Sequence, residues 1–190
     1  MDDFELLTTI LSALKWRQLN GNIKMITDEA GALYYQKLGI EHIWDLGIDT
    51  TLDKFRDYAI DPAIFWAAGK ILALGEQKIP VAMLDTDFVA WVNLEEKLEK
   101  TKLAVIHRED IDAKIYPGVE YFNLTGNYTL PEWDWTVLPC NTAFLYINDE
   151  NLKEYYTEQA INFMKITPAV FDPLTFMVFA EQRLLAMSAQ

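Results

Sequence analysis

The chain has 190 residues, a length that suits one domain with a sizeable hydrophobic core. Hydrophobic residues make up 51% of it and aromatic residues 13%, which excludes a disordered or low-complexity protein. The net charge of −13 argues against nucleic acid or an anionic membrane as a partner, because both require a positive field.

The cell compartment is indicated by three features of the sequence. A single cysteine, Cys140, excludes an internal disulfide and fits a reducing environment. Asp2, Asp3 and Glu5 give the N-terminus the wrong charge for a secretory signal. The apolar stretches are too short for the roughly 20 residues of a membrane span. We therefore expect a cytoplasmic protein, one domain over residues 1–190, with no integral membrane segment.

The first half of the chain is predicted to begin with a helix over residues 4–19. Its apolar face holds Phe4, Leu7, Ile10, Leu11, Leu14 and Leu19. There follow a short strand at 23–26, a helix at 29–38 and a mixed segment at 40–57. Asp61-Pro62, an N-cap followed by proline, predicts a helix that runs to Gly75.

The second half is predicted to alternate strands and helices. Strands are expected at 81–84, 103–106 and 141–147, with a Pro-Gly turn and a further strand within 115–127; helices are expected at 95–102, 149–165 and from 172 to the end. Alternation of this kind predicts an α/β protein with a mainly parallel central sheet and helices on both faces.

Asp85 and Asp87 follow the apolar run at 81–84, which we interpret as a buried strand. Because side chains alternate along a strand, both carboxylates are expected on one side, with Thr86 on the other. Two like charges there repel each other, and a divalent cation relieves that repulsion. Oxygen ligands suit Mn²⁺ or Mg²⁺. The metal hypothesis, and any function that rests on it, requires that the two carboxylates lie together, open to a cleft and unpaired with a cationic side chain.

A second Asp-x-Asp shows how weak this motif is alone. Asp110 and Asp112 have the same spacing, but they lie in a charged run from His107 with no apolar strand leading into it. We interpret that run as a solvated loop. In parallel sheets ligands collect beyond the carboxyl ends of strands, and Asp28 and the Asp85/Asp87 pair are both expected at such ends.

The whole pattern resembles the GT-A glycosyltransferases, most like bacterial capsule-type or glycogenin-like members with a DxD motif. The resemblance covers roughly residues 10–185. It is carried by Thr27-Asp28-Glu29 with Gly31, by Phe65-Trp66 and Gly69-Lys70, and above all by the runs LDTDFVAW (84–91) and NTAFLYIN (141–148). It implies a nucleotide-binding α/β sandwich that transfers a sugar, in polysaccharide biosynthesis, from a UDP- or GDP-linked donor to a saccharide acceptor, using Mn²⁺ or Mg²⁺.

The resemblance also implies roles for individual residues. Asp85 and Asp87 would hold the metal that bridges the donor's phosphates, with Asp28, Lys70 and Thr86 as nucleotide contacts. Asn141, Thr142, Glu181 and Gln182 would contact the donor or acceptor sugar. No residue stands out as the catalytic base. Each assignment has a structural alternative: Asp28 as a helix N-cap, Lys70 as a surface lysine, Asn141 as a turn residue, and Glu181 and Gln182 as a solvated helix face.

Other chemistry-bearing residues are given structural interpretations. Trp66 and Trp91 could stack on a sugar or a base, but aromatic residues beside a strand more often belong to the core. His107 could be a third ligand, although a lone histidine in a charged run is usually a surface residue. Cys140 is expected to be inert because no histidine is near it in sequence.

Two departures from the family bear on activity. The family usually begins with a strand whose end holds the base, whereas this chain starts in a helix, and many members have a later histidine ligand that is missing after His107. The chain is then a truncated or minimal version, or its donor site is incomplete. The alternative to an enzyme is a non-catalytic GT-A-like binding or interaction protein.

Overall fold

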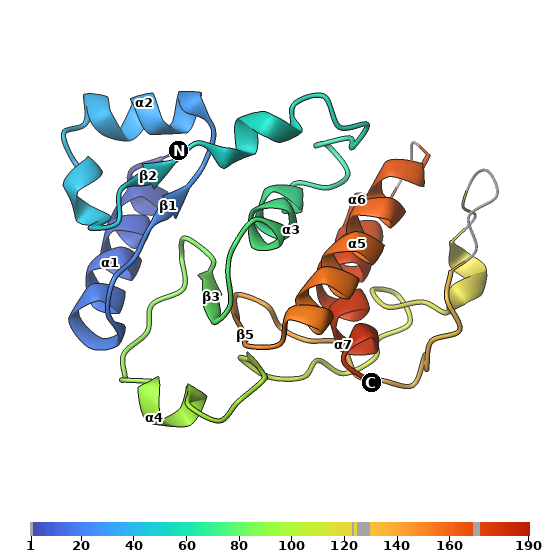
Figure 1. The fold of residues 1–190 in the computed structure, drawn as a ribbon. Coiled ribbons are helices and arrows are strands. Elements are labelled where there is room, and N and C mark those ends of the chain that lie inside the picture. Colours follow the sequence, from blue (N-terminus) through green and yellow to red (C-terminus); the bar gives the residue numbers. More distant parts are fainter. Residues whose placement is uncertain (1, 123, 125–129, 169–171) are drawn as a thin grey trace.

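The computed structural model describes residues 2–122, 124, 130–168 and 172–190. Its helices are α1 (Asp3–Asn20), α2 (Glu29–Lys37), α3 (Ala68–Gly75), α4 (Glu95–Leu98), α5 (Glu150–Ile166), α6 (Pro173–Val178) and α7 (Leu184–Ser188). Its strands are β1 (Met25–Ile26), β2 (Ile48–Asp49), β3 (Val81–Leu84), β4 (Leu103–Val105) and β5 (Phe144–Ile147). Figure 1 shows α1, α2, β1 and β2 at one side of the molecule and the remaining strands with α3 and α5 beside them.

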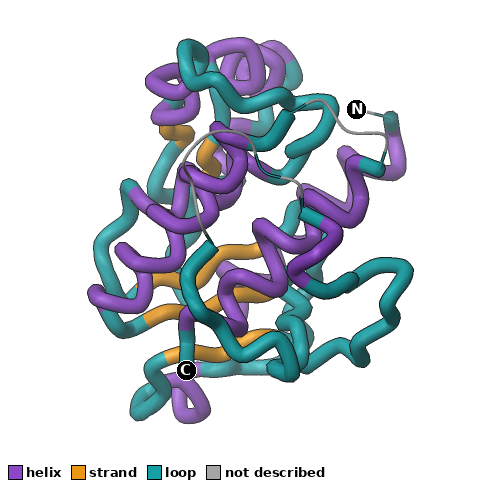
Figure 2. The backbone as a smooth tube through the Cα atoms, turned by 90° about the vertical axis from the view of Figure 1, so that its right-hand side faces the viewer, coloured by secondary structure: helices purple, strands orange, loops and turns teal. Residues whose placement is uncertain are grey.

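The strands form two separate sheets, so the expected mainly parallel central sheet is wrong. β1 and β2 pair in parallel, whereas β3, β5 and β4 form an antiparallel sheet with β5 in the middle. Figure 2 shows the two groups of strands apart from each other. The error has a physical cause: an apolar run of a few residues indicates a buried strand but carries no sign of its direction.

The strands with more partner strands are more deeply buried. All four residues of β5 are buried, because β5 has a partner on each edge and a hydrophobic cluster on each face. β3 is only partly buried along its length, which differs from the buried strand expected at this position. Its partial exposure reflects an edge without a partner strand in the described part of the chain.

The helices begin at aspartates that cap them. Asp2 and Glu5 form a capping box at the start of α1, and Asp149 accepts a hydrogen bond from the Leu152 N–H at the start of α5. Asp172 caps α6, with Pro173 at its first position. The predicted last helix is therefore confirmed at its start, but a π turn over Phe179–Arg183 separates α6 from α7.

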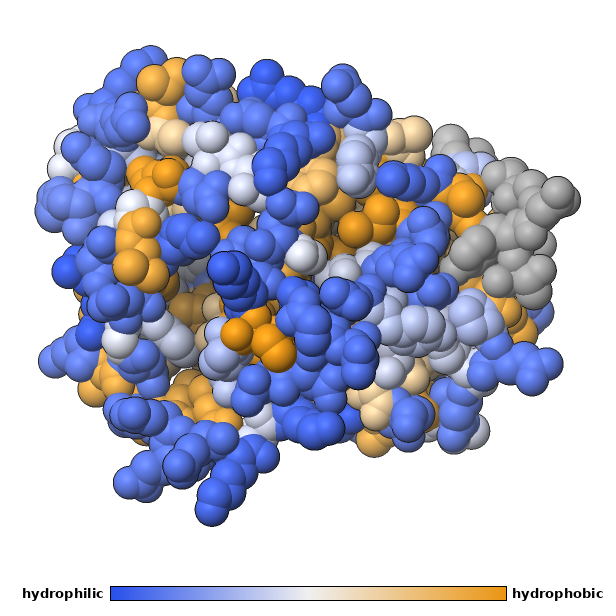
Figure 3. Space-filling model, viewed as in Figure 1, coloured by the Kyte–Doolittle hydropathy of each residue, from blue (hydrophilic) through white to orange (hydrophobic). Residues whose placement is uncertain are grey.

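The face that α1 buries is not the one expected from its apolar pattern. Thr9, Ser12, Ala13 and Trp16 are its buried residues. Phe4 and Leu7 are 75% and 64% exposed, and Leu11 and Leu14 are also exposed. Figure 3 shows apolar patches over the region where Figure 1 places α1. Small residues allow α1 to approach its neighbours closely, and the Ser12 hydroxyl donates to the Phe88 carbonyl across that contact.

Two further predictions of elements need correction. The helix expected from Asp61 begins only at Ala68, because Asp61 closes a single turn instead of capping a helix. Its Oδ1 accepts from the Ala63 N–H, and its carbonyl accepts from the N–H groups of Ile64 and Phe65. The segment 115–127 holds a short 3-10 helix at Val119–Tyr121 and no strand among its described residues, while 123 and 125–127 lie outside the described residues. In the described residues, no helix combines the length and apolar character needed to cross a bilayer.

Candidate functional site

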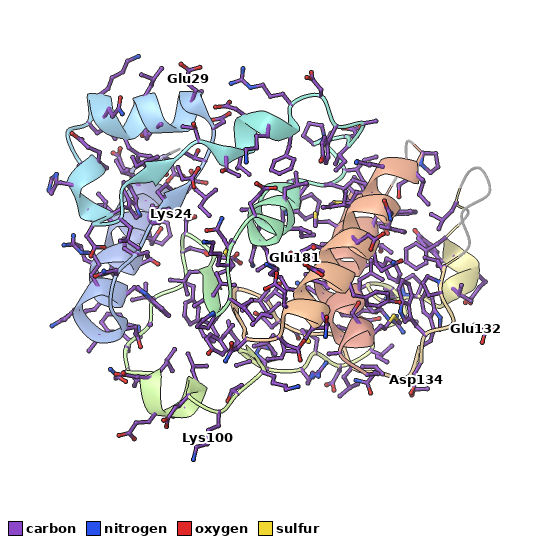
Figure 4. The ribbon with its side chains drawn as sticks, in the orientation of Figure 1. Lys24, Glu29, Lys100, Glu132, Asp134 and Glu181 are labelled. Atoms are coloured by element: carbon purple, nitrogen blue, oxygen red, sulfur yellow. The ribbon has the colours of Figure 1, made fainter. Side chains whose placement is uncertain are left out.

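A cleft of about 1180 Å³ separates the α1–β1 side of the molecule from the α3–β3 side. Its lining includes Lys24 from the first side and Lys70, Asp85, Asp87 and Glu181 from the second. Figure 4 labels Lys24 and Glu181, which lie on opposite sides of this cleft. Its volume lies just above the range of about 300–1000 Å³ that ligand pockets of proteins usually span, so it has room for a ligand of nucleotide-sugar size.

Asp85 and Asp87 lie in the turn after β3 and not on the strand itself, which corrects the expected strand alternation. β3 ends at Leu84, and the Phe88 N–H donates to the Asp85 carbonyl to close the turn. The Asp85 N–H donates to the Ala143 carbonyl, so the turn is fixed to the segment that leads into β5. Both carboxylates and Thr86 line the cleft.

Lys70 joins two of the predicted site residues. Its ammonium lies 2.6 Å from Asp85 Oδ1 and 2.9 Å from Glu181 Oε1, and it also donates to the Thr142 carbonyl. The Lys70 and Glu181 side chains are each only 12% exposed. Lys70 is therefore no ordinary surface lysine. This pairing also means that Asp85 does not meet the condition set for the metal hypothesis, because a cationic side chain already contacts one of its oxygens.

The pKa of Asp85 is raised above its ordinary value. Burial is the main cause, and the carboxylates of Glu181 and Asp87 act in the same direction. Lys70 opposes them through its charge and its hydrogen bond. A half-buried acid among other acids holds its charge with difficulty, so a further cation in the cleft would bind favourably here.

Glu181 is held in place from three elements. It lies in the π turn Phe179–Arg183 between α6 and α7. Its Oε1 accepts from Thr142 Oγ1 at 2.9 Å, and its carbonyl accepts from the Tyr156 hydroxyl of α5 at 2.9 Å. Thr142 is 2% exposed, so its hydroxyl serves Glu181 and does not reach a ligand.

Asn141 and Gln182 belong to a second polar group beside the first. Asn141 Nδ2 donates to Glu109 Oε1 at 2.9 Å, and His107 Nε2 lies 3.0 Å from the same oxygen. The Tyr116 hydroxyl donates to Gln182 Oε1. The cleft lining contains neither Asn141 nor Gln182, so the structure does not bring them to Asp85 as it does Glu181.

Sequence reasoning missed Glu109, which it placed in a solvated loop. Arg108 forms a β-bridge with Cys140, and the Glu109 N–H donates to the Pro139 carbonyl. The pairing of β4 with β5 thus extends past the strand ends as far as Glu109. The one feature of the sequence that could have placed Glu109 near the sheet is the strand predicted just before it, at 103–106. The residues around Glu109 are polar and give no sign of a strand.

Of Asp28, Trp66, Trp91 and Cys140, only Trp66 lines the cleft. Asp28 Oδ1 accepts from the Gly31 N–H at 2.8 Å as the N-cap of α2, and Asp28 is not among the residues lining the cleft. Trp66 lines the cleft and is 57% exposed, whereas Trp91 is exposed outside it. Cys140 is fully buried, burial raises the pKa of its thiol, and Arg108 donates to its Sγ.

The cleft fits a metal only together with a ligand. Among the described residues, no three His, Cys, Asp or Glu side chains gather as a protein-only metal site. Asp85 and Asp87 supply two carboxylates, and Mg²⁺ is usually bound through one or two carboxylates with the remaining oxygens from phosphates and water. Because Lys70 contacts Oδ1 of Asp85, a cation would bind Asp85 through Oδ2.

Comparison with known proteins gives one match. The model of a family of unknown function, DUF6734, matches residues 1–190. No curated protein and no solved structure matches the chain.

Proposed function

This chain belongs to DUF6734, a family of unknown function, and we propose that it is a metal-dependent glycosyltransferase that moves a sugar from a UDP- or GDP-linked donor to a saccharide acceptor. The observation that supports the proposal is the group formed by Lys70, Asp85, Asp87 and Glu181 at the wall of a cleft of about 1180 Å³. That group combines a fixed cation with carboxylates on a surface that a diphosphate can reach.

In this proposal different residues of the chain contact different parts of the donor. Asp85 does not meet the condition of being free of a cationic partner, so the proposal needs the oxygen that Lys70 does not contact. Asp87 and the Oδ2 atom of Asp85 would hold Mn²⁺ or Mg²⁺ at the diphosphate, and Thr86 would contact the same group. Lys70 holds Asp85 in place and adds positive charge near the phosphates. Trp66 provides an exposed ring at the cleft for the base or the sugar. A divalent ion there would neutralise the charge that develops on the departing nucleoside diphosphate.

The sugar contacts of the proposal rest on fewer residues than the sequence suggested. Glu181 lines the cleft and is the residue that remains available to an acceptor or donor hydroxyl. Thr142 and Asn141 act through neighbours, Thr142 by its bond to Glu181 and Asn141 by its bond to Glu109. The catalytic base and the stereochemical course are not assigned.

Calorimetric titration with UDP and GDP tests the donor site. We expect binding in the presence of Mn²⁺ that is lost with a chelator, and a melting temperature that rises by mass action, worth about 2.7 kcal/mol at a ligand concentration of about 100 Kd. Asp87→Asn should abolish the metal-dependent part. Asp110→Asn is the matched control, because Asp110 has the same Asp-x-Asp spacing in an exposed loop. Equal binding by both variants would refute the site.

Transfer is tested separately by a panel of nucleotide-sugars in a hydrolysis assay. Release of UDP or GDP from one sugar by the wild-type chain, and none by Asp87→Asn, supports an enzyme. Metal-dependent binding without hydrolysis of any donor would reject the transferase.

One observation favours the second candidate, a non-catalytic binding protein. Lys70 already places a positive charge on Asp85, so the chain has its own cation where the metal is proposed. A melting temperature that does not shift with any nucleotide at millimolar concentration, with or without Mn²⁺, would favour this candidate. A cytoplasmic location remains a prediction under either candidate, and a part in polysaccharide biosynthesis remains a prediction under the first.

A further inference from the structure

The helix α1 has an apolar face that the described part of the chain leaves exposed. Phe4, Leu7, Leu11 and Leu14 are all exposed. They follow one another at intervals of three, four and three residues, which places them on one stripe of the helix. The next position in that series, Gln18, is also exposed. The stripe therefore runs along almost the whole of α1.

This exposed stripe lies opposite the face by which α1 packs on the rest of the protein. Thr9 is two residues from both Leu7 and Leu11, which at 3.6 residues per turn places it about 160° around the helix from each. Thr9 and Trp16 are buried, and both line the cleft. The stripe therefore faces away from the cleft. Figure 1 shows α1 at the edge of the molecule.

The spacing of the stripe indicates what covers it. Alternating steps of three and four residues are the heptad spacing by which one helix packs against another. A stripe of two apolar residues in every seven is the narrow seam of a helix pair, whereas a helix that lies on a lipid surface has a wider apolar face. The net charge of −13 also opposes binding to an anionic membrane. The spacing therefore favours a second helix as the partner.

The charges of α1 are divided between its two ends. Asp3 and Glu5 lie in its first turn, whereas Lys15 and Arg17 lie near its C-terminal end. Arg17 is also 3.6 Å from Asp45, but its side chain remains 35% exposed. A parallel second copy of α1 would put acid beside acid and base beside base, whereas an antiparallel copy puts each acidic end beside a basic one. The charge pattern therefore selects an antiparallel copy of the same helix.

We propose that two copies of this chain form a symmetric dimer through α1, with the two helices antiparallel. The stripe sets the register: Phe4 packs against Leu14 of the second copy, and Leu7 packs against Leu11 of the second copy. The two-fold axis repeats both contacts, so all four apolar residues of each copy are covered. One surface then serves both copies, as an isologous interface requires.

Two further contacts flank this seam in the proposed register. Asp3 lies beside Arg17 of the second copy, at the flanking positions that form interhelical ion pairs in coiled coils. The Lys15 ammonium lies 5.2 Å from the centre of the Trp91 ring, which is exposed at the same end of α1. Because Lys15 directly follows Leu14, Phe4 of the second copy would come close to Trp91 and cover part of its ring.

The contact is small, so the dimer is a weak one. Each copy contributes four seam residues and a few flanking ones, compared with about 20–30 residues a side in a standard interface. We therefore expect reversible association with a Kd on the order of 10–100 μM. Thermal melting at about 1 μM then reports on the single chain, because the dimer population depends on protomer concentration.

This inference goes beyond the proposed donor site and does not rest on it. The seam and the cleft lie on opposite faces of α1, so a dimer leaves the cleft open. Association is read from the mass in solution and donor binding from nucleotide titration. Failure of either test therefore leaves the other proposal standing.

Sedimentation equilibrium of the whole chain tests the dimer. We expect the average mass of the wild type to rise from that of one chain toward that of two as the concentration approaches about 500 μM. Leu7→Glu puts a charge into the seam twice and should weaken association more than tenfold. Leu174→Glu is the matched control and should associate like the wild type. Leu174 is 48% exposed on α6, which Figure 1 shows on the other side of the molecule from α1.

Both substitutions replace an exposed leucine, so each variant should keep the melting temperature of the wild type within a few degrees at about 1 μM. The fold of α1 and its buried face are then intact in both variants. A weaker dimer of Leu7→Glu alone can therefore be assigned to the seam.

Disulfide crosslinking tests the direction of the two helices. A mixture of Phe4→Cys chains and Leu14→Cys chains should form a crosslinked dimer under mild oxidation. Leu14→Cys alone should not, because its two copies lie ten residues apart in the proposed register. That offset is about 15 Å, beyond the roughly 7 Å between Cα atoms that a disulfide can bridge. The wild type is the blank, since its Cys140 is fully buried.

Three results would overturn the proposal. The first is a wild type that remains a single chain over the whole concentration range, whether or not it binds vesicles of neutral phosphatidylcholine. The second is equal association of Leu7→Glu and the wild type, which would place the interface away from α1. The third is a crosslink in Leu14→Cys alone with none in the mixture, which would mean that the helices are parallel.

Discussion

The ammonium of Lys70 lies within 3 Å of two carboxylates, those of Asp85 on one side and Glu181 on the other. The three residues are far apart in sequence, at the start of α3, after β3 and in the π turn after α6. Lys70 therefore fixes the end of β3 to the C-terminal helices. It also offsets part of the negative charge that Asp85 and Glu181 bring to the cleft.

Lys70→Met should destabilise the fold. Removing one partner of a buried ion pair costs about 3–5 kcal/mol, and we expect about 2–3 kcal/mol here because Asp85 opens to the cleft. Urea unfolding measures the change. Lys54→Met is the matched control: Lys54 pairs with Glu76 at 2.7 Å but is 62% exposed, so its loss should cost much less than the loss of Lys70. Equal losses in the two variants would contradict the structural role of Lys70.

Trp66→Ala should weaken nucleotide binding about tenfold, since stacking of a base on an aromatic ring is worth about 1–3 kcal/mol. Trp66 lines the cleft and is exposed there. Trp91→Ala removes the same side chain from a site that is exposed but outside the cleft lining. Titration of both variants with the nucleotide that binds wild type gives the comparison. A larger loss for Trp91→Ala would place the ligand elsewhere.

Ala13→Leu should destabilise the protein although it makes α1 more apolar. Ala13 is 2% exposed and packs with Tyr35 and Trp44, so added methylenes overfill that space at a cost of about 1–3 kcal/mol. Leu14→Ala, one residue along, changes an exposed side chain and should alter stability by less than about 0.5 kcal/mol. Thermal melting ranks the two. The reverse order would mean that α1 packs by the face its sequence pattern indicates.

Asp149→Ala should lower stability at neutral pH and much less in acid. The Leu152 N–H, which donates to this carboxylate, is the main cause that lowers the pKa of Asp149, and Lys102 acts in the same direction. A lowered pKa in the folded state stabilises the protein above the ordinary aspartate pKa of about 3.9, and that contribution is lost as the pH falls through the lowered value.

Urea midpoints of wild type and Asp149→Ala, measured from neutral pH down to about pH 3, follow this contribution. The gap between them should be widest at neutral pH and should close in acid. Asp110→Ala, at an exposed loop position, should show no gap at either end. A gap for Asp149→Ala that is constant with pH would show that its carboxylate charge does not support α5.

Local signals in the sequence were sufficient for several elements. The aspartates at 28, 149 and 172 each predict a helix start, and each caps a helix in the structure. Capping is an interaction between residues a few positions apart, so the sequence contains all of it. The end of α1 before Gly21 is equally local, because that glycine has a φ of 96° that other residues rarely adopt.

The direction of the strands and the buried face of α1 had to come from the tertiary structure. β3 and β5 are both apolar runs of four residues, yet β3 is an edge strand and β5 is the central strand of their sheet. Likewise the leucines of α1 follow a helical period, but small residues such as Ala13 and Ser12 occupy the contact with the rest of the molecule. Close approach there depends on what lies opposite, which no local pattern records.

The sequence by itself determined the positions of the capped helices, the short apolar strands and the aspartates that follow β3, because each depends on residues near one another in the chain. Only the tertiary structure decided that Lys70 pairs with Asp85 and Glu181, that Asn141 donates to Glu109, and that residues of α1, β1, α3 and β3 line one cleft. Those contacts join residues separated by many positions, and their formation depends on how helices and strands pack in three dimensions.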